Sequence, residues 1–205
     1  MDRFWNPVHT IVGDGAAAET ADVLRQMGAQ GKNVLLLVWN NALLEREGFA
    51  GLLANQDFKV TPYCFQASNP TVGQLFETYR QTRELRPAAV VAVGGGSILD
   101  VGKSLCCLYG ADISSEEELR AAIREKTLPS PAARWIGIPT TAGTGSEVTW
   151  WATIWDPEKN AKLSVESKEN YAYAALVDPS LAAGMPVSLA VSSGLDAVAH
   201  AVESY

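Results

Sequence analysis

Cysteine and histidine are scarce in this chain of 205 residues, which contains three cysteines and two histidines. Cys64 stands alone, while Cys106 and Cys107 are neighbours, so their spacing fits neither a disulfide framework nor a zinc knuckle. Thiols without a pairing pattern are typical of a protein in a reducing compartment.

Basic clusters and long apolar runs are also missing. The chain has 16 basic and 23 acidic side chains and a net charge of -7. Without a basic cluster to follow a phosphate backbone, nucleic acid is not expected as a partner. No apolar run approaches the ~20 residues that span a bilayer, and residues 1–7 lack the build of a signal peptide. We therefore expect a cytoplasmic protein without membrane contact.

A valine-rich apolar run at residues 89–93 is followed by Gly94, Gly95 and Gly96, and then by residues that can begin a helix. This pattern predicts a buried strand, a tight turn and a helix. Glycines let a ligand approach the backbone, and the first N–H groups of a helix favour an anion such as a pyrophosphate. A tight turn without any ligand is an equally good interpretation of this stretch alone.

Strand and helix patterns alternate along the first 185 residues. The alternation predicts an α/β fold with a doubly wound, Rossmann-like, mostly parallel sheet whose ligands gather at the carboxyl ends of its strands. A hairpin is expected within residues 150–165. The other expected strands are 9–12, 33–39, 58–65, 89–93, 134–138 and 174–177, and the expected helices are 16–27, 42–53, 71–85, 97–109 and 116–126.

Residues 139–149 form a loop rich in threonine, serine and glycine, directly after the strand expected at 134–138. Many surface linkers have this composition. Its position at the ligand edge of the sheet instead favours a binding loop, because small hydroxyl donors suit phosphate and ribose oxygens.

From Pro186 the pattern becomes one long amphipathic helix. No stop signal ends this helix, and its apolar stripe lacks the partners that such a stripe normally has. We therefore expect a truncated chain, with an α/β domain at 1–185 and a helix at 186–205 that belongs to a further, incomplete part. Within this helix, Asp196 and His200 share one face, a spacing at which both could reach one metal ion. Two ligands are too few for a catalytic metal, so an ion pair is the better interpretation of these two residues alone.

Four motifs occur in the order and spacing of the iron-containing (group III) alcohol dehydrogenases. They lie at residues 94–100, 138–147, 178–186 and 194–205. From about residue 8 to its end, the chain resembles that family. Glycerol dehydrogenases and dehydroquinate synthases share the fold, but the threonine-rich loop is more similar to the alcohol dehydrogenase branch.

The resemblance implies a dinucleotide-binding α/β domain at 1–185 and an all-helical domain of which 186–205 is only the start. It places a metal and the substrate in the cleft between the two domains. Asp100 and Lys162 would stand near the nicotinamide end as catalytic candidates, and Asp196 and His200 would be the first two of four metal ligands. The residues that it places along the cofactor are Asn69, Gly95, Gly96, Ser97, Asp100, Thr140, Thr141, Thr144, Ser146 and Lys162.

The chain also departs from the family pattern. The family's other two metal ligands are histidines of the helical domain, which no residue here supplies, so full binding of Fe²⁺ or Zn²⁺ is not expected. Asn40 stands where relatives that prefer NAD carry an aspartate, which favours NADP. Trp150, Trp151 and Trp155 either narrow the aldehyde end of the cleft or simply pack.

The resemblance implies hydride transfer between NAD(P) and a primary alcohol or aldehyde, with phosphonoacetaldehyde as one candidate and this length of chain inactive alone. Two alternatives stay open: a non-catalytic dinucleotide-binding fragment, and a metal-dependent lyase of the dehydroquinate synthase type. Residues 8–12 would form the edge of a homodimer, as in relatives.

Overall fold

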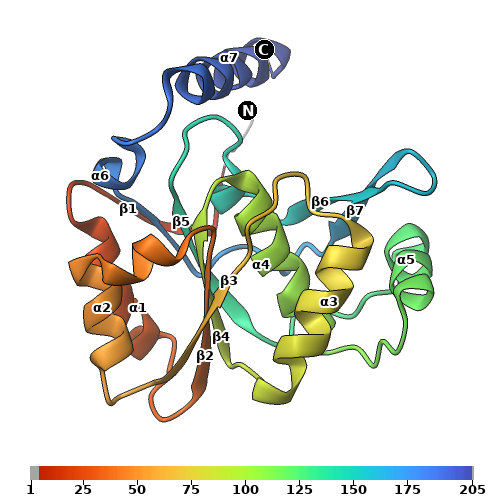
Figure 1. Ribbon diagram of the computed structural model, residues 1–205, viewed down its shortest axis with the longest axis horizontal. Helices are drawn as coiled ribbons and strands as arrows, with labels where there is room; N and C mark the ends of the chain where they lie inside the picture. Colours follow the sequence, from red (N-terminus) through yellow and green to blue (C-terminus); the bar gives the residue numbers. More distant parts are fainter. Residues whose placement is uncertain (1–4, 205) are drawn as a thin grey trace.

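Six parallel strands form the central sheet of the protein, described here by a computed structural model of residues 5–204 (Figure 1). Every neighbouring pair runs parallel, in the order β1-β8-β5-β4-β2-β3. The predicted doubly wound, parallel α/β sheet is therefore confirmed. The strands are β1 (His9–Val12), β2 (Asn33–Val38), β3 (Lys59–Cys64), β4 (Ala89–Gly94), β5 (Arg134–Pro139) and β8 (Ala174–Val177).

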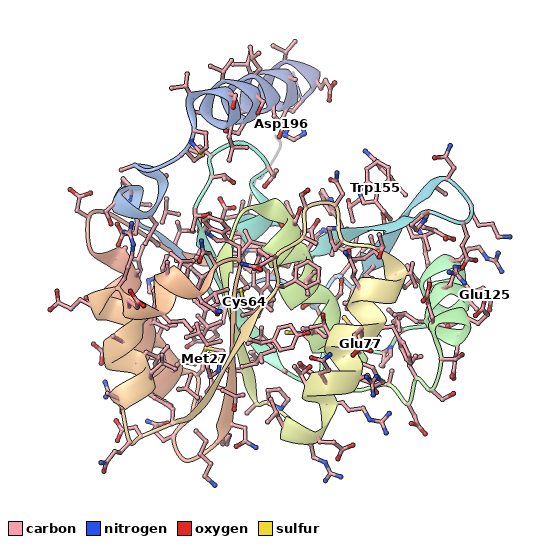
Figure 2. All side chains as sticks on the ribbon, viewed as in Figure 1. Met27, Cys64, Glu77, Glu125, Trp155 and Asp196 are labelled. Atoms are coloured by element: carbon pink, nitrogen blue, oxygen red, sulfur yellow. The ribbon has the colours of Figure 1, made fainter. Side chains whose placement is uncertain are left out.

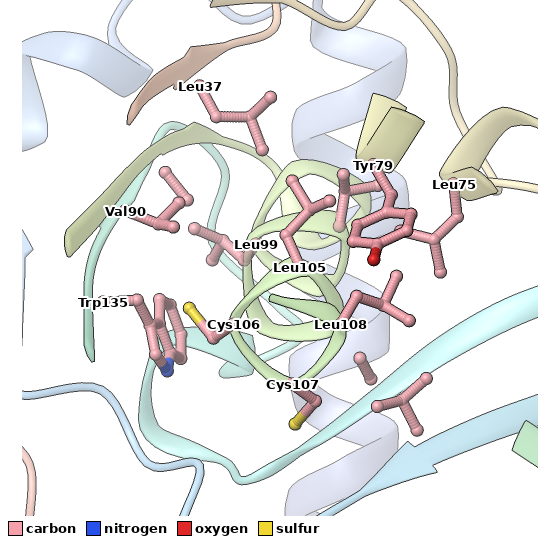
Figure 3. Packing of buried hydrophobic residues seen from close by; sticks show 14 of the residues in the cluster. Leu37, Leu75, Tyr79, Val90, Leu99, Leu105, Cys106, Cys107, Leu108 and Trp135 are labelled. Carbon is pink, nitrogen blue, oxygen red and sulfur yellow. The ribbon is translucent and has the colours of Figure 1, made fainter. Parts of the chain in front are cut away.

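Helices cover both faces of the sheet, because its buried strands alternate between two apolar cores. In β2, Leu35 and Leu37 enter one core, while Leu36 and Val38 enter the other. Figure 3 shows the first core, packed around α4. The helices are α1 (Thr20–Gln26) and α2 (Glu47–Ala54) on one face, and α3 (Val72–Thr82) and α4 (Gly96–Leu108) on the other, with α5 (Glu116–Glu125) packed beside α3.

Three of the expected helices are interrupted or change type. The segment at 42–53 is a 3-10 helix, η2 (Asn41–Glu45), followed by α2, because Arg46 between them has an extended backbone with φ −68° and ψ 141°. Residues 16–27 likewise divide into η1 (Ala16–Glu19) and α1, and residues 71–85 end in η3 (Arg83–Leu85).

The predicted hairpin forms a separate antiparallel sheet of β6 (Trp151–Asp156) and β7 (Ala161–Glu166). It packs beside α4 and α5. The buried Arg120 joins α5 to the hairpin, since its Nε lies 3.2 Å from Oδ1 of the buried Asp156 at the end of β6.

The last helix, α7 (Val187–Glu203), stands apart from the helices that cover the sheet (Figure 1). Its apolar side chains are exposed. The short α6 (Pro179–Ala182) precedes it in the chain, and the remaining short helix, η4 (Ser146–Val148), lies between β5 and β6. The division into domains at 185 stays a prediction. Within residues 5–204, every helix is too short or too polar to span a lipid bilayer.

Strand β1 lies at one edge of the sheet and pairs only with β8 among the described residues. Its Val12 side chain is 68% exposed. An open edge of this kind can pair with a second copy, but the homodimer stays a prediction.

Candidate functional site

A cavity of about 1480 Å³ lies at the carboxyl ends of the sheet strands. The chain passes from β2 outward to β3, and then returns to the other side of β2 to form β4. The carboxyl ends of β2 and β4 therefore flank the point where the strand order reverses, which is where open α/β sheets bind ligands.

All the candidate catalytic, cofactor-binding and metal-ligating residues line this one cavity, although the chain places them as far apart as residues 40 and 200. They are Asn40, Asn69, Gly95, Gly96, Ser97, Asp100, Thr140, Thr141, Thr144, Ser146, Lys162, Asp196 and His200. The structure brings the whole set together, while the role of each residue stays a proposal.

The glycine turn after β4 leaves little room for side chains. A β-carbon on Gly95 would lie 3.1 Å from Oγ1 of Thr141, and one on Gly96 would lie 3.0 Å from Thr144. Helix α4 begins at Gly96, and no side chain caps it. Its first N–H groups, which have no partner within the helix, are thus available to an anion in the cavity.

The loop after β3 contacts this turn. The backbone N–H of Asn69, in the loop after β3, donates a hydrogen bond to Oγ of Ser97, 3.1 Å away. Asn69 itself has a positive φ of 51°, a conformation that asparagine tolerates better than most residues. The contact fixes the loop after β3 against the start of α4.

Asp100 of α4 is held by three groups. Its Oδ1 accepts a hydrogen bond of 2.7 Å from Oγ of Ser146 and lies 3.3 Å from Nζ of Lys103. Its Oδ2 accepts a 3.0 Å bond from the backbone N–H of Thr153. The carboxylate therefore joins α4 to the threonine-rich loop and to the β6–β7 hairpin, at the cavity wall.

Lys103 was not singled out from the sequence. Its side chain is fully buried, and its Nζ donates to the carbonyl of Trp151 at 2.7 Å and to Oγ1 of Thr149 at 3.1 Å. Burial lowers its pKa, although the nearby Asp100 carboxylate opposes that shift. The only signal in the sequence is its spacing of three from Asp100, which is too common to identify such a contact.

Lys162 and two tryptophans line the cavity on the side of the hairpin. Nζ of Lys162 lies 4.7 Å from the ring centroid of Trp155, a cation–π distance. Trp151 is 46% exposed, and Trp150 packs edge-on against it with 5.1 Å between the centroids. Of the three tryptophans, Trp151 and Trp155 line the cavity and Trp150 does not.

Asp196 and His200 both lie on α7 and line the cavity. Figure 2 labels Asp196 on this helix. Oδ1 of Asp196 is 3.8 Å from Nε2 of His200, so both could reach one ion. Among residues 5–204, however, no group of three or more candidate metal ligands occurs. Because a catalytic metal site normally has at least three protein ligands, the described residues alone do not make a metal centre.

The sequence matches one known protein family over most of its length. Residues 7–179 match the family described as "Iron-containing alcohol dehydrogenase". The chain belongs to this family. The match covers the whole sheet and the cavity wall that the sheet provides, so the resemblance noted in the sequence is confirmed.

Two relatives illustrate the extent of the similarity. The NAD-dependent methanol dehydrogenase of Bacillus methanolicus is 29% identical, with an alignment that covers 100% of this chain and 53% of the relative. Alcohol dehydrogenase 4 of Schizosaccharomyces pombe is 30% identical, with an alignment that covers 100% of this chain and 48% of the relative. The chain thus spans about half the length of the relatives that it matches.

Solved structures agree with the fold. The NADH-dependent butanol dehydrogenase A of Thermotoga maritima superposes with a TM-score of 0.85, at 22% identity, over 99% of this chain and 50% of that one. The sulfoacetaldehyde reductase of Bifidobacterium kashiwanohense, solved with NAD⁺, superposes with a TM-score of 0.84 at 27% identity. The superposition covers 100% of this chain and 53% of that one.

Proposed function

We infer that this chain binds a nicotinamide dinucleotide along the cavity, and that the protein containing it transfers a hydride between NAD(P) and a primary alcohol or aldehyde. The observation that carries this proposal is the uncapped start of α4 at Gly95 and Gly96, where threonines of the facing loop stand so close that a β-carbon would be crowded. Backbone N–H groups and a helix dipole are then free for a pyrophosphate. Family membership and the NAD named for the relatives support the same cofactor.

The residues along the cavity suggest how the cofactor would be held. Ser97, Thr140, Thr141 and Thr144 offer hydroxyl groups beside the glycine turn. Asn69 is fixed to the same turn through Ser97. Together they would bind the phosphates and riboses, while the bound nicotinamide would supply the hydride chemistry.

Asp100 and Lys162 are proposed to face the nicotinamide and the substrate. The Asp100 carboxylate is held rigidly by Ser146 and Thr153, which suits a group that orients a ring. Lys162 offers three N–H donors on the hairpin side. Asp196 and His200 would contribute two ligands to the metal that the family name implies.

An aldehyde that carries an anionic group is the substrate class that we propose, with phosphonoacetaldehyde as the specific candidate. The similar reductase acts on sulfoacetaldehyde by its name, and Lys162 provides a cation in the cavity. The test measures turnover of phosphonoacetaldehyde and of acetaldehyde by protein loaded with Fe²⁺ or Zn²⁺. Phosphonoacetaldehyde should be turned over faster, and equal turnover of both aldehydes would contradict the anionic preference.

A second candidate is dinucleotide binding without turnover. It is favoured by the absence, within residues 5–204, of three metal ligands in one place. Binding of a dinucleotide without any change of cofactor absorbance in the presence of metal and alcohol would support it. Family membership favours both candidates over a lyase of the dehydroquinate synthase type.

The experiment that tests the binding proposal is a calorimetric titration of the chain with NADH and NADPH. The Gly96→Val variant should bind at least tenfold more weakly, because its side chain would meet Thr144 and fill the anion site. Gly51→Val is the matched control, since a β-carbon at Gly51 meets nothing within 4 Å. Wild-type affinity in Gly96→Val, or no binding by the wild type, would contradict the proposal.

A further inference from the structure

A buried ammonium group lies behind the part of the cavity wall where α4 meets the threonine-rich loop and the hairpin. It belongs to Lys103, whose side chain has no solvent exposure and which is the one buried lysine among residues 5–204. Three acceptors surround its Nζ: the carbonyl of Trp151 at 2.7 Å, Oγ1 of Thr149 at 3.1 Å and Oδ1 of Asp100 at 3.3 Å. All three of these residues line the cavity. The ammonium therefore reaches the cavity only through residues of its wall.

Lys103 is not placed to bind a ligand itself. A lysine ammonium has three protons to donate, and the three acceptors of the wall account for all of them. Lys103 also lies two turns along α4 from Gly96, about 10 Å at 1.5 Å per residue. This distance is too long for a contact with an anion at the glycine turn. What Lys103 can do is orient the groups that a ligand would meet.

The contact with Lys103 decides how the hydroxyl group of Thr149 can be used. Because an ammonium group only donates, Oγ1 of Thr149 accepts this bond and keeps its own proton for another partner. Among the described residues, that proton is directed to the carbonyl of Ser146 over a long 3.3 Å. Thr149 is half-buried and lines the cavity, so a ligand oxygen there can compete for the proton. Hydrogen bonds in a chain polarise one another, which makes this hydroxyl a stronger donor.

The position of Lys103 is costly for the fold. Burial lowers its pKa, which means that the folded protein disfavours the charged form even though Asp100 attracts it. A methionine would fill a similar space without a buried charge. Charged groups held under such strain are more frequent beside binding and catalytic sites than elsewhere. The burial thus agrees with a role at the cavity, while the three contacts define that role.

We propose that Lys103 is a positioning residue for the nicotinamide end of the dinucleotide: it makes the Thr149 hydroxyl a donor toward the ligand and holds the Asp100 carboxylate nearby as an acceptor. The inference rests on the proposed function, in which Asp100 faces the nicotinamide, and adds a residue that acts without touching the cofactor. A carboxamide such as that of nicotinamide has a C=O that accepts and an NH₂ that donates. It matches a hydroxyl and a carboxylate that both contact one ammonium group.

Calorimetric titration of the intact chain with NADH and with ADP-ribose separates positioning from folding. ADP-ribose has the adenosine, the pyrophosphate and the second ribose of NADH but lacks the nicotinamide. Lys103→Met should weaken NADH binding about tenfold and leave ADP-ribose binding within about twofold of the wild type, since a polarised hydrogen bond is lost only at the nicotinamide end. Lys159→Met, in the exposed turn of the hairpin, is the matched control and should leave both affinities unchanged.

Thr149→Val tests whether Lys103 acts through the hydroxyl group. This variant should also weaken NADH binding and spare ADP-ribose binding. The double variant with Lys103→Met should bind NADH no more weakly than Lys103→Met alone, because both changes remove the same donor. A loss of affinity in the double variant equal to the product of the two single losses would contradict action through Thr149.

A measurement on the wild type keeps the inference testable if Lys103→Met does not fold. In protein labelled with ¹⁵N-lysine, at about pH 6, the buried ammonium of Lys103 should give a signal protected from exchange with water, because exposed lysines exchange quickly. Saturating NADH should shift this signal, since it changes the partner of Thr149. ADP-ribose should leave the signal where it is.

The possible failures separate from one another. Equal weakening of NADH and ADP-ribose binding by Lys103→Met, wild-type NADH affinity in that variant, or an ammonium signal that both ligands shift alike would overturn this inference and leave the proposed dinucleotide site in place. Binding of neither ligand by the folded wild type would overturn the proposed function and this inference with it. Circular dichroism shows whether each variant is folded.

Discussion

The backbone of Gly143 lies against the carbonyl oxygen of Ser193, so closely that a β-carbon on residue 143 would overlap that oxygen. Gly143 also has a φ of +147°, which side chains rarely adopt. The threonine-rich loop therefore meets α7 at a point where two separate constraints require glycine. Since Ser193 and Asp196 both line the cavity, this contact sets the position of α7 over the site.

Gly143→Ala should loosen α7 without unfolding the sheet. The added methyl group cannot fit beside Ser193, and α7 is the element that should move, because its apolar side chains are exposed rather than packed in the core. Hydrogen exchange measured by mass spectrometry should become faster in residues 187–203 and stay unchanged in β4. Gly145→Ala is the control: φ is also positive there, at 61°, but the nearest neighbouring atom is 3.8 Å away. Equal exchange in both variants would contradict the account.

Thr71→Ala should lower the free energy of unfolding by about 1 kcal/mol, because it removes the cap of α3. Oγ1 of Thr71 accepts from the N–H of Gln74 at 3.2 Å, and the Gln74 side chain accepts from the N–H of Thr71 at 3.0 Å. Urea unfolding measures the change. Thr127→Ala, at an exposed site after α5, should cost less than about 0.5 kcal/mol. A cost for Thr71→Ala no larger than that of the control would sink the prediction.

The sequence predicts the sheet well, because its strands are apolar runs of the right length between turn residues. The run at 89–93 and the glycines after it are an example: both the strand and the turn lie where the pattern places them. That the candidate residues meet in one cavity was also predictable, since motifs at fixed spacing identify residues that the fold gathers at one edge of the sheet. Their roles stay predictions.

Contacts between distant polar groups could not be predicted in the same way. Periodicity tells which face of α4 is apolar, but not that Lys103 on it will reach the carbonyl of Trp151. The extended backbone of Arg46 has no local signal either, since its neighbours are good helix formers. Both features depend on where other segments lie, and tertiary contacts decide them.

Native-state alkylation should modify Cys64 and spare the other two thiols. Cys106 and Cys107 are fully buried in α4, and burial raises the pKa of Cys106 well above its usual value and that of Cys107 to about 12. Cys64, at the end of β3, is partly exposed. Mass spectrometry after iodoacetamide should find one modified cysteine in buffer and three in urea. Modification of Cys106 as fast as that of Cys64 in buffer would contradict the burial.

The buried Lys103 should make stability rise with pH under alkaline conditions. Burial lowers its folded-state pKa below the usual 10.5 and outweighs the attraction of Asp100. Between that lowered pKa and 10.5, the unfolded chain binds a proton that the folded chain has released, and stability rises with pH wherever the unfolded state binds more protons. The charged lysine thus opposes folding at neutral pH, and the penalty is relieved as pH increases through this window.

Lys103→Met isolates the effect. Urea unfolding of the wild type and the variant from pH 7 to pH 10.5 should show the wild type gaining stability relative to the variant as pH increases, since methionine carries no charge to bury. Lys159→Met, in the exposed turn of the β6–β7 hairpin, should give a difference from the wild type that stays constant over the same range. A difference for Lys103→Met that is flat or falls with pH would mean that the hydrogen bonds to Trp151 and Thr149, together with Asp100, compensate the buried charge completely. The carboxylate at the cavity wall would then be held by a lysine that stays protonated throughout.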